Sequence, residues 1–262
     1  MVDQKAVEKL LRLVAEGEQD QAEEMLKKDK NLLLVAGTVT DLSGREFKQI
    51  TAFQYALWAL DWHMWRMMQK YLPTEVQAEQ FNALESKGTA HGKHFSLQPL
   101  IDALQKYVDN AEEVWKYGYQ ATDHWCKKVG GAQRLLPVHV VNEYCHPTRL
   151  FYPCSEFKED VLLRSRSYKL WDYFESKYVD RDWFTFQYDG GKVGDSFAYA
   201  RGASVLVEAV GKNVSTALQG WAVVARDRQS IQTLSKIRIQ QLELLSSQLS
   251  SAASHTQTFG AK

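Results

Sequence analysis

The stretch Thr51-Ala-Phe-Gln-Tyr-Ala-Leu-Trp-Ala-Leu-Asp61 decides how the front of the chain is expected to fold. Thr51 is a favourable helix N-cap, because its hydroxyl can accept a hydrogen bond from an N–H of the first turn. Asp61 can cap a second helix in the same way, and the sequence predicts that helix from Trp62 to Leu72. Pro73 prevents its smooth continuation. The stretch therefore predicts a helix, a tight turn and a second helix.

The first thirty residues repeat this plan. Apolar side chains at spacings of three and four form one helical face, at Val7, Leu10, Leu11 and Val14. Gly17 interrupts the pattern, and a second short helix starts near Asp20, with Ala22, Met25 and Leu26 on its face. The front of the chain is therefore expected to contain two helical hairpins.

A β-ribbon is predicted between the two helical hairpins. Residues 32–39 are rich in apolar and β-branched side chains and are expected to form the first strand. Residues 41–44 favour a turn, and Phe47 to Ile50 are expected to form the second strand. The inner turns near Gly17 and Asp61 are about 44 residues apart, whereas an ankyrin repeat has about 33 residues. The inserted ribbon accounts for the difference.

The second hairpin resembles an ankyrin repeat. Thr51-Ala-Phe-Gln-Tyr-Ala56 resembles the motif Thr-Pro-Leu-His-x-Ala, and Asp41-Leu-Ser-Gly44 resembles the turn that precedes it. Ala52 and Gln54 replace the usual Pro and His, and Leu60-Asp61 replaces Gly-His. A generic pair of helical hairpins explains the pattern equally well. The expected fold class is mainly α with a minor β component, with ankyrin-like hairpins packed on a helical domain that carries short β-hairpins.

The rest of the chain is expected to form one further domain and a tail. Residues 73–93 are interpreted as a linker, and one continuous helix is predicted from Leu97 to Val129, ending at Gly130-Gly131 with Trp115 and Trp125 buried. A helix near 164–177, a strand pair at 183–200 and a long helix after Gly220 follow. The predicted domains are 1–75, 76–245 and a flexible Ser/Thr-rich tail at 246–262.

Charge and composition exclude several classes of protein. Lys+Arg and Asp+Glu are both 32, so the chain lacks the positive surplus that nucleic-acid binding needs. The chain starts without a secretory signal, and no apolar run approaches the roughly 20 residues of a membrane span. Three cysteines argue against a disulfide framework and suit a reducing compartment. We therefore expect a soluble protein that binds no nucleic acid.

The densest reactive chemistry lies after Pro137, at His139, Glu143, Cys145 and His146. If Pro137 opens a helix, His139, Glu143 and His146 share one face, where they could bind a metal ion or transfer protons. The neighbouring valines also favour a strand, which would separate Glu143 from His146. These four residues are the candidate catalytic residues, and neither a metal site nor a cofactor is predicted. The alternative is a structural segment with buried, hydrogen-bonded polar groups.

Two other groups of reactive residues are weaker candidates. Cys126 follows His124 closely, but a thiol nucleophile needs its histidine brought into contact by the fold. His91-Gly-Lys-His94 could meet a ligand, although it is interpreted as part of the solvated linker.

The blocks Ile50 to Trp65 and Leu136 to Phe157 resemble poorly characterised ankyrin-containing proteins of intracellular bacteria. That resemblance implies an effector that is made in the bacterial cytoplasm, is translocated into the host cytosol, and binds a host protein through its ankyrin-like region. The alternative function is a thiol- or metal-dependent enzyme that acts on a host protein through residues 139–146. The resemblance implies no particular catalytic residue, and whether the protein is an enzyme stays open.

Overall fold

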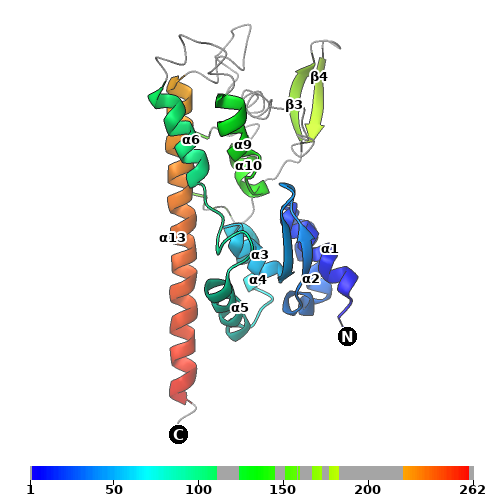
Figure 1. The fold of residues 1–262 in the computed structure, drawn as a ribbon. Coiled ribbons are helices and arrows are strands. Elements are labelled where there is room, and N and C mark those ends of the chain that lie inside the picture. The colour runs from blue at the N-terminus through cyan, green and yellow to red at the C-terminus, as the bar shows by residue number, and fades with distance from the viewer. Residues whose placement is uncertain are drawn as a thin grey trace. The chain divides into compact units, whose positions relative to one another are not determined.

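The protein is described by a computed structural model that covers residues 2–110, 124–144, 151–157, 159, 167–172, 177–182 and 221–259. It divides into two compact units. Unit 1 contains Met1–Phe95, Lys158–Leu162 and Lys236–Lys262, and unit 2 contains Ser96–Phe157 and Leu163–Ser235. The described residues are mostly helical with short antiparallel strand pairs, so the expected fold class, mainly α with a minor β component, is confirmed (Figure 1).

Unit 1 begins with the first helical hairpin, α1 (Gln4–Ala15) and α2 (Gln19–Lys28). The Asp3 carboxylate caps α1 by accepting a hydrogen bond from the Lys5 N–H at 3.0 Å. The apolar face expected from the sequence is buried, at Val7, Leu10, Leu11 and Val14. This hairpin forms as the spacing of its apolar residues predicts.

The second hairpin consists of α3 (Ala52–Trp58) and α4 (Trp62–Gln69). Thr51 and Gln54 form a capping box, in which each side chain accepts a hydrogen bond from the backbone N–H of the other residue, both at 3.2 Å. Asp61 caps α4 by accepting from the Met64 N–H, also at 3.2 Å. Both predicted caps are confirmed.

The inner turns of the two hairpins have the same backbone geometry. Gly17 and Leu60 each adopt a left-handed conformation, with φ of 75° and 57°. The next residue then donates its N–H to the carbonyl five residues back, from Glu18 to Leu13 at 2.8 Å and from Asp61 to Ala56 at 3.0 Å. This bond pattern is the Schellman arrangement of helix C-termini. The two hairpins are therefore structural repeats of one another.

The ribbon between the hairpins is formed by β1 (Gly37–Thr40) and β2 (Glu46–Ile50). At its tip, one oxygen of the Asp41 carboxylate accepts the N–H groups of Ser43 and Arg45, both at 2.9 Å. The predicted start of the first strand is wrong, because Lys30–Leu34 form a 3-10 helix, η1. The Asp29 carboxylate caps that helix at the Asn31 N–H, and this local bond competes with strand pairing.

The interpretation of residues 73–93 as a linker is wrong. Helix α5 (Thr74–Lys87) follows Pro73 and buries Gln77, Gln80, Phe81 and Leu84. The Gln80 amide nitrogen donates to the Leu33 carbonyl at 2.9 Å, and its amide oxygen accepts from the Thr51 hydroxyl at 2.5 Å. Because two buried glutamines stand where an amphipathic pattern would require apolar residues, this segment shows no clear helical periodicity.

Helix α13 (Trp221–Phe259) confirms the long helix predicted after Gly220. Its residues Leu245 and Leu249 are buried in the hydrophobic core of unit 1. The predicted flexible tail is corrected over 246–259, which are helical. The hydroxyls of three serines donate hydrogen bonds to carbonyls four residues back, each at 2.9 Å, in Ser247, Ser250 and Ser251. The polar groups of these side chains therefore find their partners within the helix.

Unit 2 begins with α6 (Gln98–Asp109), which ends at Asn110 with a non-helical ψ of 12°. The prediction of a single helix from Leu97 to Val129 is therefore wrong. The helix ends at this position because asparagine favours helix ends over helix interiors. Trp125 is buried as expected, in the π-helical turn η2 (Trp125–Val129), whereas Trp115 lies outside the described residues. Gly130 does not stop the helix, since α9 spans Gly130–Gln133.

Two strands replace the helix that was predicted near 164–177. β3 (Ser167–Asp172) pairs antiparallel with β4 (Lys177–Asp182), and the register sets Lys169 opposite Asp180 and Asp172 opposite Lys177. This pairing joins two segments, so a spacing test for helices along one segment does not detect it. The strand pair predicted at 183–200 lies outside the described residues.

Candidate functional site

The predicted reactive segment forms a buried helix, α10 (Val138–Tyr144). Pro137 opens it, because the Pro137 carbonyl accepts the N–H groups of Val140 and Val141 at 3.0 and 3.2 Å. The helical interpretation is thus correct and the strand interpretation is wrong. His139 and Glu143 lie one turn apart on one helix face, with 2% and 3% of their surfaces exposed.

The structure brings together two of the four candidate catalytic residues, since Cys145 and His146 lie outside the described residues. The catalytic assignment of all four stays a prediction. Among the described residues, no group of three or more His, Cys, Asp or Glu side chains is arranged to hold a metal ion. In the second thiol candidate, Cys126 is buried, and the His124 ring bonds the Ala103 carbonyl at 3.3 Å.

A buried polar chain at the end of α10 was not expected. The Tyr144 hydroxyl donates to the Asp227 carboxylate at 3.0 Å and accepts from the Gln133 amide at 3.2 Å. All three side chains are buried, and they connect α9, α10 and α13 within unit 2. Because Asp227 is 83 residues from Tyr144, no local motif could have found it. A buried carboxylate needs such a donor to remain stable.

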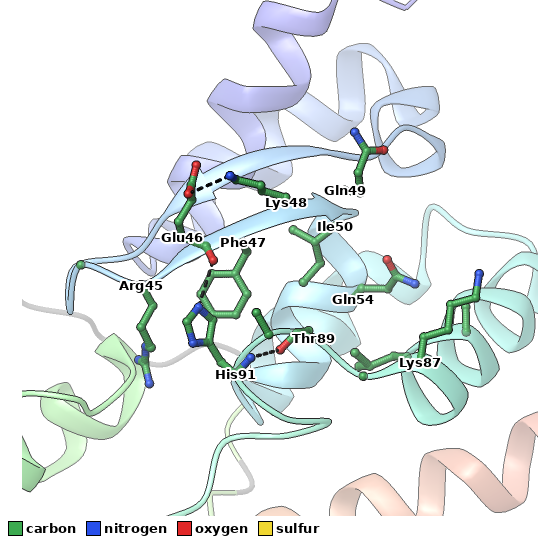
Figure 2. A pocket seen from close by; sticks show the side chains of 15 residues that line it. Arg45, Glu46, Phe47, Lys48, Gln49, Ile50, Gln54, Lys87, Thr89 and His91 are labelled. Carbon is green, nitrogen blue, oxygen red and sulfur yellow. Dashed lines mark hydrogen bonds and ion pairs between the residues drawn. The ribbon is translucent and has the colours of Figure 1, made fainter.

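Unit 1 contains a groove of about 630 Å³ beside strand β2. One wall is β2 itself, a second is the C-terminal part of α5, and the third is the loop from Gly88 to His91 (Figure 2). The exposed side chains of Lys48 and Lys87 stand on two of these walls. The sequence does not reveal the groove, because the polar pattern of α5 and its loop is typical of a linker.

The loop after α5 is held in place by its own turn and by His91. Thr89 and Gly92 exchange backbone hydrogen bonds at 3.0 and 3.1 Å, and the left-handed Gly88 and Gly92 permit the turn. The His91 Nε2 bonds the Glu46 carbonyl at 2.9 Å, and its ring packs edge-on against Phe47 with centroids 4.7 Å apart (Figure 2). This histidine fixes the loop to strand β2.

His94 also bonds other residues of unit 1, so the solvated-linker interpretation of residues 91–94 is wrong. Its Nδ1 bonds the Leu57 carbonyl at 3.1 Å, and its Nε2 bonds the Glu85 carboxylate at 2.5 Å. Together the two histidines fasten the loop to β2, α3 and α5.

Cationic side chains outnumber carboxylates along the groove, which is lined by Arg45, Lys48 and Lys87 against Glu46. The Arg45 guanidinium pairs with the buried Asp41 carboxylate at 2.8 Å and lies over the Trp58 ring. Lys48 pairs with Glu46 at 3.3 Å, with both side chains well exposed, so this pair is weak. Lys87 has no carboxylate partner among the described residues. Among the side chains that line the groove, positive charge therefore exceeds negative charge.

Comparison with known proteins shows the family to which this chain belongs. The family model described as the CBUA0006 C-terminal domain matches residues 99–249, more than half of the chain, so this protein belongs to that family. It is similar to the uncharacterized protein CBUA0006 of the intracellular bacterium Coxiella burnetii (strain RSA 493 / Nine Mile phase I). The two are 36% identical over an alignment of 278 positions. The alignment covers 96% of this chain and 78% of the relative. No solved structure matches this chain.

The matched family residues include α10 and much of α13, whereas the groove precedes them. Within the described ranges, no helix combines the length and the apolar character that a membrane crossing requires.

Proposed function

We propose that this protein is a protein-interaction protein, an effector of an intracellular bacterium that binds a host protein through its ankyrin-like unit. The observation that carries the proposal is the groove of about 630 Å³ between β2, the end of α5 and the His91 loop. It is open, lined by exposed cationic side chains, and framed by elements that hydrogen bonds hold rigidly. In a preformed, rigid cleft, little binding free energy is lost to ordering side chains and loops when a partner binds.

The repeated hairpin geometry supports the ankyrin-like part of the proposal. Gly17 and Leu60 produce the same inner turn, and Leu60 stands where the ankyrin pattern has glycine. Repeat proteins stack such units and use the resulting surface to bind partners. The β1–β2 ribbon precedes α3 as the turn precedes the first helix of an ankyrin repeat.

A site-specific photocrosslinker tests whether the groove binds a host protein. The full chain carries p-benzoylphenylalanine in place of Lys87 in the groove, or in place of the exposed Lys9 on α1 as a control. After irradiation in host-cell extract, a defined set of proteins is expected to crosslink at Lys87 and not at Lys9. Identical crosslinks at both positions, or none at Lys87, would refute the proposal.

The double variant K48E/K87E is the second arm of this test. It reverses two groove charges, while K5E/K9E reverses two exposed charges on α1. Partner capture should fall only in the groove variant, with equal melting temperatures for both. Translocation is tested separately, with an enzymatic reporter fused to the chain, expressed in Coxiella burnetii and assayed in the host cytosol.

A further inference from the structure

One edge of strand β2 faces the groove and carries backbone groups that strand β1 does not use. The Asp41 N–H donates to the Arg45 carbonyl at 2.9 Å, so that carbonyl points toward β1. Backbone groups alternate in direction along an antiparallel strand, which turns the carbonyl of Glu46 away from β1. The His91 Nε2 bonds the Glu46 carbonyl, as this alternation requires.

The same alternation turns the N–H and C=O of Lys48 toward the groove. Beyond Glu46, no described residue outside β1 forms a backbone hydrogen bond with β2 along this stretch. The edge ends at a β-bulge, where the register shifts between Gly37 and Val39 and Gln49 takes a φ of 54°. A short strand edge is therefore presented between His91 and Gln49, and such edges pair readily with a further strand.

The charges beside this edge specify its occupant. Lys48 lies on the strand, and Lys87 lies across the groove at the end of α5 (Figure 2). Both side chains are exposed, and Lys87 has no carboxylate partner in the described part of the chain. An extended peptide has side chains that alternate in direction, so acidic residues at every second position can face these cations while the main chain bonds the edge.

We propose that the groove binds an extended, acidic peptide segment of the partner as an added β-strand alongside β2. The Lys48 backbone bonds the main chain of the peptide, and the side chains of Lys48 and Lys87 contact its carboxylates. This assignment rests on the proposed function, since it specifies the chemistry of the partner that the groove would bind.

The first experiment measures fluorescence anisotropy of a labelled Glu-Val-Glu-Val-Glu-Val peptide with the full chain. The acidic peptide is expected to bind, and a Lys-Val-Lys-Val-Lys-Val peptide is expected to bind at least tenfold more weakly. K48E/K87E should weaken binding of the acidic peptide roughly tenfold or more, while K5E/K9E leaves it unchanged. Equal binding of both peptides, or no binding of the acidic one, would overturn the proposal.

The second experiment tests strand addition without altering the protein. N-methyl groups are placed on the first, third and fifth residues of the acidic peptide, or on the second, fourth and sixth. Because alternate N–H groups point to opposite edges, one series should lose binding at least tenfold and the other should retain it. Equal effects of the two series would exclude an added strand. If host proteins still crosslink at Lys87 in that case, the proposed function stands and only this inference fails.

Discussion

Gly17 and Leu60 occupy the same left-handed position in the inner turns of two successive helical hairpins, with φ of 75° and 57°. Only glycine takes this conformation without a steric cost, so the two turns differ in strain although they share one hydrogen-bond pattern. Leu60 is buried, and its apolar contacts offset that strain.

Gly17→Ala should lower the free energy of unfolding by about 1–2 kcal/mol, because a Cβ atom disfavours the left-handed conformation. Gly131→Ala is the matched control, since Gly131 lies in helix α9 and its added Cβ would meet no atom within 4 Å. That control should be neutral or slightly stabilising. Urea denaturation measures the free energy of unfolding of both variants. Equal changes for the two variants would show that a side chain at position 17 causes no strain.

Gln80→Ala should destabilise unit 1 by about 1–3 kcal/mol. Gln80 is buried and bonds the Leu33 carbonyl and the Thr51 hydroxyl, so truncation leaves buried polar groups without partners. Glu79→Ala changes the neighbouring exposed residue of α5 and should shift the midpoint little. If the thermal or urea midpoints of the two variants coincide, the stability of unit 1 does not depend on the hydrogen bonds of Gln80.

Tyr144→Phe should destabilise the chain by about 1–3 kcal/mol, because the buried Asp227 carboxylate loses the donor at 3.0 Å and Gln133 loses an acceptor. Tyr152→Phe is the control, since Tyr152 is 38% exposed and its ring, which lies 5.7 Å from the Arg226 guanidinium carbon, is retained. Denaturant titration measures the free energy of unfolding of both variants. A loss for Tyr152→Phe that equals the loss for Tyr144→Phe would contradict a role for the buried chain.

Alkaline stability should depend on Tyr55. Burial, together with the nearby Asp41 carboxylate, raises the pKa of the Tyr55 hydroxyl well above its usual value near 10. Folding thus favours the protonated form, and its contribution is lost as the pH rises from about 10 through the folded-state pKa, by up to about 1.4 kcal/mol per pH unit. Tyr55→Phe should lose less stability than the wild type above pH 10. Parallel stability–pH curves for the two proteins would contradict this.

His139→Ala, Glu143→Ala and Cys145→Ala test the predicted reactive segment. Because His139 and Glu143 are buried, each of these two variants should lower the unfolding free energy by about 1–3 kcal/mol. The exposed Arg134→Ala is the control. Melting temperature and partner or substrate engagement are measured together on every variant. Lost engagement at an unchanged melting temperature would instead support a catalytic or binding role for this segment.

Residue types and their spacing predict the elements whose signals are local. The caps at Thr51 and Asp61 and the apolar face of α1 depend on residues within one or two turns of each other. Short-range sterics and hydrogen bonds decide these features, so spacing and residue type predict them correctly.

Features that join distant segments depend instead on contacts that form when the chain folds. Helix α5 is stabilised by Gln80 bonding Leu33 and Thr51, and the α10 region by Tyr144 bonding Asp227. The groove, likewise, exists because His91 fastens a loop to Glu46, 45 residues earlier in the chain. Buried polar groups must find partners wherever the fold brings them, and a periodicity measured along the chain does not contain that information.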